Sequence, residues 1–158
     1  MNIQKDKVRP IVPEDLPALK IAIDANELFP SAMLDEMISD YFNNKESNDF
    51  WFTYDSGKPV AIGYCAPEKM TEGTWNLYLI AVHPDCQRLG YGTSMLRYIE
   101  QTLIQRGERL LLVETSGLDS FEKTREFYRK SGYEQEARIR EFYRAGEDKI
   151  VFRKLLVN

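Results

Sequence analysis

Apolar and polar residues recur along the chain with two different periods, and these periods predict its secondary structure. In four stretches the apolar residues return every three or four positions, which is typical of helices with one buried face. Shorter runs rich in β-branched and aromatic residues, bounded by glycine, proline and polar residues, predict strands. The predicted strands are 8–12, 50–54, 60–65, 75–82, 110–113, 137–143 and 149–155, and the predicted helices lie between residues 15 and 28, 31 and 43, 93 and 107, and 120 and 131.

Polar residues before the helical stretches predict how the helices begin, because their side-chain oxygens can accept hydrogen bonds from the first helical N–H groups. The candidate caps are Asp15, Ser31 and either Asp119 or Ser120. Glu122 is placed to complete a capping box at the last helix. Gly132 follows that helix and predicts a C-terminal cap.

The order of the predicted elements is strand, two helices, three strands of antiparallel type, helix, strand, helix and two strands. Strands and helices mixed in this way predict an α/β fold, a mixed sheet with helices on both faces. The run Leu110–Val113 is apolar without alternation, which is typical of a strand buried on both faces. A length of 158 residues suits one domain, so we expect a single domain over residues 1–158.

Composition narrows the classes of function. The formal net charge is −4, so the basic face of a nucleic-acid-binding protein is not expected. Cys65 and Cys86 lie far apart in the sequence, and the single histidine, His83, offers no second nitrogen ligand, so we expect no metal site. Residues 1–7 are polar and charged, unlike a signal peptide, and no apolar run is long enough for a membrane span. We therefore expect a cytoplasmic protein in a reducing compartment.

The stretch Val82–Thr93 carries the clearest chemistry. Pro84 cannot donate to a sheet ladder, so the preceding strand should stop just before it. Gly90 and Gly92 allow a tight turn and a close approach of the backbone to a ligand. The first N–H groups of the next helix then point into this loop, with the positive end of the helix dipole behind them. With the positive charge of Arg88, this predicts an anion site, most often one for phosphate.

The glycine spacing does not fit the dinucleotide-binding fingerprint, and no Gly-Lys-Ser/Thr follows for a triphosphate loop. The segment Gln87–Gly92 (QRLGYG), after Val82–Pro84, instead resembles the acyl-CoA pyrophosphate loop of the GNAT superfamily of N-acetyltransferases. The segment Tyr128–Tyr133 (YRKSGY) resembles that family's aromatic-x-x-x-Gly-aromatic segment. The order of elements is also that of the GNAT fold. The resemblance implies a mostly antiparallel central sheet, helices on both faces and a splayed central strand pair.

The resemblance further implies transfer of an acetyl group from acetyl-CoA to a primary amine, by direct attack in a ternary complex and without a metal. Backbone near Ile80 would bond the acetyl carbonyl, Val82 would bond the pantetheine arm, and Gln87–Thr93 would hold the pyrophosphate. The residues implied in cofactor binding are Ile80, Ala81, Val82, Gln87, Arg88, Leu89, Gly90, Tyr91, Gly92 and Thr93.

Two proton carriers are needed, because an alkylammonium with a pKa of about 10.4 must lose a proton before attack and the leaving thiolate must gain one. The resemblance implies Tyr128 as the acid; the alternative is a core-facing aromatic at helical spacing. Relatives often carry a glutamate base where this chain has Asn76, which cannot take up a proton. Glu114 is a candidate base, or else a partly exposed carboxylate satisfied by arginine or backbone. Tyr78 is a candidate relay or wall of the acceptor pocket, or else a packed aromatic.

Three functions follow from these residues. The first, which we predict, is acetylation of a small amine or amino-acid-like molecule. The second is the same chemistry on a protein N-terminus or lysine, and the third is a non-catalytic acyl-CoA-binding module. The expected partners are acetyl-CoA and an amine acceptor, without nucleic acid or membrane, and the family's habit of pairing through edge strands implies a possible homodimer.

Overall fold

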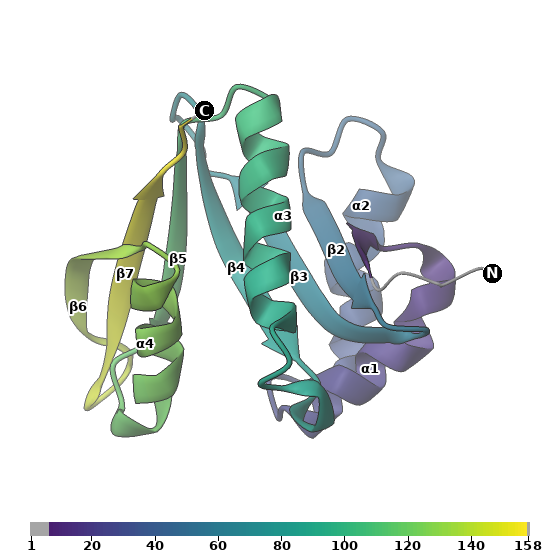
Figure 1. The fold of residues 1–158 in the computed structure, drawn as a ribbon, viewed down its shortest axis with the longest axis horizontal. Coiled ribbons are helices and arrows are strands. Elements are labelled where there is room, and N and C mark those ends of the chain that lie inside the picture. Colours follow the sequence, from purple (N-terminus) through teal and green to yellow (C-terminus); the bar gives the residue numbers. More distant parts are fainter. Residues whose placement is uncertain (1–6, 158) are drawn as a thin grey trace. The chain divides into compact units, whose positions relative to one another are not determined.

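The computed structural model describes residues 7–157, which form seven strands and four α-helices (Figure 1). The expectation that residues 1–7 are unlike a signal peptide concerns a stretch that, apart from Lys7, lies outside the described residues. The strands are β1 (Lys7–Pro10), β2 (Phe50–Asp55), β3 (Pro59–Pro67), β4 (Thr74–Val82), β5 (Leu110–Ser116), β6 (Glu134–Arg144) and β7 (Glu147–Leu155). The helices are α1 (Leu16–Ala25), α2 (Leu34–Asn43), α3 (Tyr91–Gln105) and α4 (Glu122–Lys130), with 3-10 turns η1 (Pro13–Asp15), η2 (Ser31–Met33), η3 (Pro84–Cys86) and η4 (Asp119–Phe121). No helix within 7–157 has the length and apolar character needed to cross a bilayer.

The strands form one sheet in the order β1-β2-β3-β4-β5-β7-β6. Strands β4 and β5 pair in parallel, whereas β1–β2, β2–β3, β5–β7 and β6–β7 pair antiparallel. The predicted α/β class with a mixed, mostly antiparallel sheet is confirmed, and each predicted strand and helix is present. The parallel ladder joins Thr74–Leu77 to Leu110–Val113, while β4 continues to Val82 and β5 to Ser116. The ladder thus occupies only the first part of each strand, as expected for a splayed central pair.

Two compact units make up the chain. The first comprises the residues up to Ala66 together with Leu79–Ile99, and the second comprises Pro67–Tyr78 together with the residues from Glu100 onward. Strand β4 and helix α3 contribute residues to both units. The single domain over residues 1–158 stays a prediction.

In the first unit, helices cover both faces of the sheet (Figure 1). Neighbouring residues of β2 point to opposite faces, so this strand contacts helices on both sides. Trp51 is buried on one face in an apolar cluster with α1 and α2. The members of this cluster from the two helices are Leu19, Ile23, Leu34 and Ile38. On the other face the rings of Phe50 and Phe52 lie 6.2 and 5.8 Å from the Tyr98 ring of α3. A Cβ on Gly63 of β3 would lie 2.4 Å from the Phe52 ring, so this face has no room for a larger residue there.

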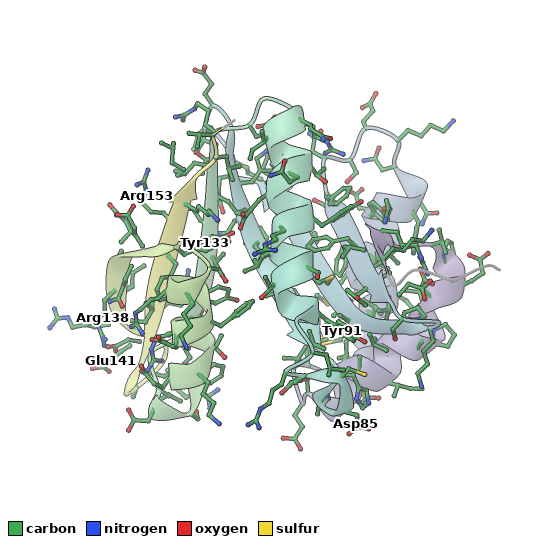
Figure 2. All side chains as sticks on the ribbon, in the orientation of Figure 1. Asp85, Tyr91, Tyr133, Arg138, Glu141 and Arg153 are labelled. Carbon is green, nitrogen blue, oxygen red and sulfur yellow. The ribbon has the colours of Figure 1, made fainter. Side chains whose placement is uncertain are left out.

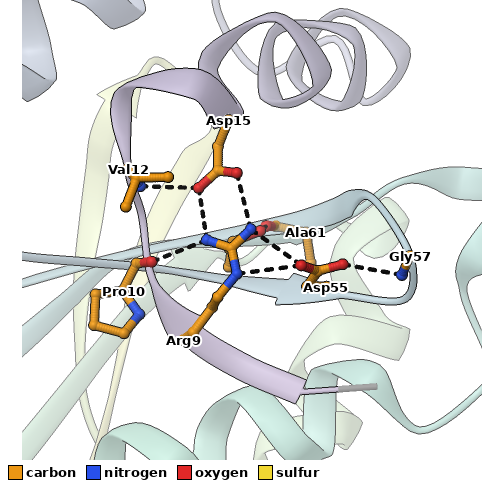
Figure 3. A network of polar contacts seen from close by, with 8 residues as sticks. Arg9, Pro10, Val12, Asp15, Asp55, Gly57 and Ala61 are labelled. Atoms are coloured by element: carbon orange, nitrogen blue, oxygen red, sulfur yellow. Dashed lines mark hydrogen bonds and ion pairs between the residues drawn. The ribbon is translucent and has the colours of Figure 1, made fainter. Parts of the chain in front are cut away.

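Arg9 of β1 joins two carboxylates beside the start of α1 (Figure 3). Its two Nη atoms donate to Asp15 at 2.8 and 2.9 Å, and its Nε donates to Oδ2 of Asp55 at 3.2 Å. Asp15 also accepts from the Val12 N–H at 2.9 Å, so it does not cap α1 as predicted. Burial by itself raises the pKa of Asp15, but the hydrogen bonds from Arg9 and Val12 outweigh it and hold that pKa below its usual value.

The other predicted N-terminal caps are also wrong, for a shared reason. A 3-10 turn directly precedes both α2 and α4, and this moves the first helical N–H groups past the residue expected to cap them. Ser31 Oγ instead donates to a carboxylate of α1 at 2.9 Å. Neither Asp119 nor Ser120 caps α4 through its side chain. Glu122 accepts from Arg125 at 2.7 Å and closes no capping box.

The predicted C-terminal cap of α4, in the second unit, is confirmed. Gly132 has a φ of +92°, and the Tyr133 N–H donates to the carbonyl of Tyr128 at 3.0 Å, which is the long hydrogen bond of a Schellman motif. The Tyr133 hydroxyl donates to Glu100 of α3 at 2.7 Å (Figure 2). Nζ of Lys154 of β7 donates to the other Glu100 oxygen at 2.9 Å. This cluster ties the end of α4 to α3 and β7.

Strand β5 is buried on one face, so the predicted burial on both faces is wrong. Leu111 and Val113 are buried, whereas the residues between and before them are only half-buried. Val113 lies opposite Phe152 in the ladder with β7, and the Phe152 ring lies 5.7 Å from that of Tyr128 of α4. Helix α4 therefore covers this face of β5 and β7.

Candidate functional site

The connection between β4 and α3, in the first unit, contains the predicted anion loop. The turn η3 follows β4, and within it the Asp85 N–H donates to Nδ1 of His83 at 3.1 Å (Figure 2). Arg88 and Gly90 have φ values of +68° and +83°, and α3 begins at Tyr91. Because a positive φ strains most side chains, glycine is favoured at position 90. The backbone thus turns sharply just before the first N–H groups of the helix.

The start of α3 presents backbone donors at this loop. The Ser94 N–H donates to the carbonyl four residues earlier at 3.1 Å, so the N–H groups of Tyr91–Thr93 precede the first intrahelical bond. The Tyr91 ring stacks on Tyr54 of β2 with centroids 3.9 Å apart, which holds the start of the helix against the sheet. Backbone donors at the positive end of a 15-residue helix, beside the exposed Arg88, can hold a phosphate.

The side chain of Gln87 binds the end of β4. Its Nε2 donates to the Val82 carbonyl at 3.2 Å, and Nδ2 of Asn26, just after α1, donates to the same carbonyl at 3.0 Å. The sequence did not lead us to Asn26. The one available signal was that an asparagine stands at the end of a predicted helix. Leu89, also implied in cofactor binding, is 61% exposed.

The last residues of β4, Ile80–Val82, are half-buried. The His83 N–H that follows them donates to the Val60 carbonyl of β3 at 2.8 Å. Successive backbone N–H groups of a strand point to opposite edges, so the Val82 N–H points away from β3. The ladder with β5 ends at Leu77 and does not include Val82. An N–H that takes part in neither ladder is what a backbone contact from Val82 to a ligand requires.

The second unit brings two predicted catalytic residues, Tyr78 and Glu114, into one cluster around Asn76. Asn76 is 1% exposed, and its Nδ2 donates to Oε1 of Glu114 at 3.0 Å and to Oε1 of Glu68 at 2.9 Å. The hydroxyl of the half-exposed Tyr78 donates to the same Glu68 oxygen at 2.7 Å. Two carboxylates thus share one amide nitrogen, and together they can attract a cation.

Glu114 has a positive partner. Nζ of Lys149 of β7 lies 2.8 Å from its Oε2 and 3.7 Å from the centre of the Phe142 ring of β6. Desolvation, followed by the charges of Glu114 and Glu147, raises the pKa of Tyr143 beside this pair. The contacts of Glu114 are therefore those of a partly exposed carboxylate satisfied by a cation, which here is a lysine.

Tyr128 lies apart from this cluster, where α4 packs against β7. It is 4% exposed, and its ring centre is 6.0 Å from that of Tyr133 and 5.7 Å from that of Phe152. Burial raises the pKa of Tyr128, so its phenol holds its proton more tightly than that of an exposed tyrosine.

Glu68 is the residue of this cluster that sequence reasoning missed. It directly follows β3, and its N–H donates to the Thr74 carbonyl at the start of β4 at 2.8 Å. This turn places its side chain beside Asn76 and Tyr78. The available signal was an acidic residue in the connection of a predicted hairpin, but its partner is known only once the strands are in place.

Comparison with known proteins agrees with this geometry. Residues 46–135, more than half of the chain, match the family model described as an acetyltransferase (GNAT) domain. A solved structure from Desulfovibrio desulfuricans, assigned to the GNAT family of acetyltransferases, is 28% identical with a TM-score of 0.88, and the match covers 97% of this chain and 100% of that one. No curated protein matches the sequence significantly.

Two further solved structures share the fold. The ribosomal-protein-S18-alanine N-acetyltransferase of Escherichia coli is 21% identical with a TM-score of 0.77, over 98% of this chain and 96% of that one. An aminoglycoside 6'-N-acetyltransferase in complex with coenzyme A is 18% identical with a TM-score of 0.75, over 96% of this chain and 98% of that one. Their acceptors differ, so the fold does not name an acceptor for this chain.

The family match and the fold favour the catalytic interpretations over a non-catalytic acyl-CoA-binding module. The chain belongs to the GNAT family of acetyltransferases and is an acyltransferase.

Proposed function

We propose that this acyltransferase moves the acetyl group of acetyl-CoA to a primary amine of a small or amino-acid-like molecule, by direct attack in a ternary complex. One observation carries the proposal: Asn76 holds the carboxylates of Glu68 and Glu114 together, and Tyr78 donates to the first of them. An alkyl amine has a pKa of about 10.4, so it arrives as a cation that carboxylates attract. It must then lose a proton before it can attack, and a carboxylate can accept that proton.

Acetyl-CoA supplies the acetyl group as a thioester. The N–H groups at the start of α3, with Arg88, suit its pyrophosphate, and the Val82 N–H suits the pantetheine arm because it lies outside the ladder with β5. Two residues earlier on β4, the Ile80 N–H would donate to the acetyl oxygen, where negative charge develops. The other residues proposed for binding are Ala81, Gln87, Leu89, Gly90, Tyr91, Gly92 and Thr93.

Tyr128 would donate its phenolic proton to the departing thiolate. This role is supported by its place in the segment Tyr128–Tyr133, which resembles the family's, and by the absence of a hydrogen bond from its hydroxyl to any other residue within 7–157. Strand β6, whose eleven residues are all exposed at the end of the sheet, is where a second copy would pair (Figure 1). A reducing, cytoplasmic location is proposed from the wide separation of Cys65 and Cys86 in the sequence.

A turnover assay tests the proposal. The purified protein is mixed with acetyl-CoA and a panel of alkyl amines, amino acids, aminoglycosides and a peptide with a free amino terminus, and both thiol release and product mass are recorded. We expect thiol release that depends on the acceptor, with a product heavier by one acetyl group. Turnover of the peptide alone would move the assignment to protein N-termini. Thiol release without an N-acetylated product from any primary amine would contradict the proposal.

A further inference from the structure

We propose that Glu68 is the general base of this transfer, and that the acceptor amine reaches it through the hydroxyl of Tyr78. The inference rests on the proposed function and deepens it, because it assigns the proton acceptor that Asn76 cannot be. Its starting point is the 2.7 Å hydrogen bond from the Tyr78 hydroxyl to Oε1 of Glu68.

The two carboxylates of the cluster differ in their partners. Both oxygens of Glu114 are engaged, Oε1 with Asn76 at 3.0 Å and Oε2 with Lys149 at 2.8 Å. Lys149 has a side chain that is 11% exposed, so a proton on Glu114 would leave a largely buried ammonium without its counter-ion. The carboxylate of Glu68, by contrast, receives hydrogen bonds only from two neutral groups, the Asn76 amide and the Tyr78 phenol, among the residues from 7 to 157.

Tyr78 links the half-buried Glu68 to the surface. Its side chain is 50% exposed, while its hydroxyl hydrogen is directed at Glu68. A hydroxyl oxygen that donates in one direction can accept in another, so an ammonium can bond to the phenol oxygen. Tyr78 also precedes Ile80 by two residues on β4, a span of roughly 6–7 Å.

Asn76 fixes the geometry without taking part in proton transfer. Both of its amide hydrogens are directed at carboxylates, and its Oδ1 is buried without a hydrogen-bond partner among the described residues. A buried acceptor left unsatisfied in this way costs roughly 1–3 kcal/mol. Such a cost is consistent with an amide retained for its two donors.

The acceptor ammonium gives a proton to the Tyr78 oxygen as the Tyr78 hydroxyl gives its own proton to Glu68, which becomes neutral. The amine nitrogen then attacks the carbonyl carbon of acetyl-CoA, a C–N bond forms and the C–S bond breaks. The leaving sulfur takes a proton from Tyr128, which regains one as the amide nitrogen loses its extra proton, and Glu68 releases its proton to solvent.

The test compares Glu68→Gln with Glu72→Gln, an exposed glutamate of the same connection. Glutamine keeps a side-chain oxygen that can accept from Asn76 and Tyr78, so the fold should survive. We expect Glu68→Gln to lower kcat/KM by roughly 10²–10³-fold near neutral pH, and Glu72→Gln to leave it unchanged. Affinity for acetyl-CoA, measured by calorimetry, should not change in either variant.

The pH profile separates a base from a structural residue. As pH rises toward the amine pKa of about 10.4, solution supplies the neutral amine and the deficit of Glu68→Gln should shrink by about tenfold per pH unit. The titratable or charged groups around Glu68 are Tyr78 on β4 and, through Asn76, Glu114 on β5 and Lys149 on β7. Tyr78→Phe, which removes the relay, should show a smaller deficit with the same pH dependence.

Each outcome decides the matter. A deficit that shrinks with pH in Glu68→Gln, or in Tyr78→Phe should the first variant not fold, supports the inference. If the wild-type protein acetylates an amine and Glu68→Gln is equally active, or its deficit stays constant with pH, the inference about Glu68 is overturned while the proposed function stands. A wild-type protein that acetylates no amine overturns the proposed function as well.

Discussion

The substitution Asn76→Asp tests the cluster on β4 most directly, because it keeps the shape of the side chain and removes its two N–H donors. These donors bond Glu68 and Glu114 at 2.9 and 3.0 Å. An ionised aspartate would add a third negative charge at a position that is 1% exposed. Burial and two neighbouring carboxylates both disfavour that charge, so we expect the new carboxyl to hold its proton and its pKa to rise.

The magnitude follows from the bonds lost. A hydrogen bond to a charged group contributes roughly 1.5–3 kcal/mol, so losing both should lower the free energy of unfolding by roughly 3–6 kcal/mol. A protonated aspartate can donate to one of the two carboxylates, which reduces the loss to roughly 1.5–3 kcal/mol. Glu114 has a side chain that is 26% exposed, and this solvent contact favours the lower half of each range.

The stability lost in Asn76→Asp should depend on pH. In the unfolded chain the aspartate releases its proton near pH 3.9, whereas the folded protein retains it to higher pH, so folding becomes less favourable as pH rises above about 3.9. Urea unfolding at about pH 5 and at about pH 8 should therefore show the larger loss at the higher pH. Asn44→Asp is the matched control: Asn44 also donates to a carboxylate, Asp40, at 3.1 Å, but at an exposed site. It should cost under about 1 kcal/mol. A loss equal at both pH values, or no larger than that of the control, would refute the reasoning.

The other predictions concern the core, the α4 cap and the anion loop. Gly63→Ala should lower the free energy of unfolding by roughly 1–3 kcal/mol in urea titrations, because the added Cβ meets the Phe52 ring at 2.4 Å; an unchanged midpoint would contradict this. Lys154→Met should lower the free energy of unfolding by about 1–3 kcal/mol. This is below the roughly 3–5 kcal/mol of a fully buried ion pair, because the Lys154 side chain is 29% exposed. Lys130→Met, which breaks a surface ion pair, should lower it by under about 1 kcal/mol. Arg88→Ala should weaken acetyl-CoA binding by roughly tenfold to a hundredfold in calorimetry, and equal affinity would count against the phosphate site.

The elements and the anion loop could be predicted from the sequence because both depend on neighbours in the chain. The period of apolar residues located each strand and helix, and the spacing of Gly90 and Gly92 located the turn before α3. The N-terminal caps failed because one extra 3-10 turn changes which N–H groups need a partner, and no residue pattern announced those turns.

The cluster around Asn76 depends instead on strand pairing. Glu68 meets Asn76 only through the turn between β3 and β4, and Glu114 meets Asn76 only through the pairing of β4 with β5. Two of the three predicted catalytic residues, Tyr78 and Glu114, lie in this cluster, and their catalytic roles stay predictions. The ion pair with Lys149 and the position of Glu68 required the register, which a single sequence does not specify.

The positions of the two tryptophans give each compact unit its own optical reporter. Trp51 lies in the first unit and Trp75 in the second, at 0 and 5% exposure, so both indole signals should change when their surroundings melt. Replacing either one by phenylalanine leaves a protein whose fluorescence follows a single unit. Coincident denaturation curves from the two variants would mean that β4, which runs through both units, couples them into one cooperative transition. Separate curves would mean that the half bearing the anion loop can open while the half bearing Glu68 stays folded, so that the enzyme could loosen its hold on a cofactor by local melting.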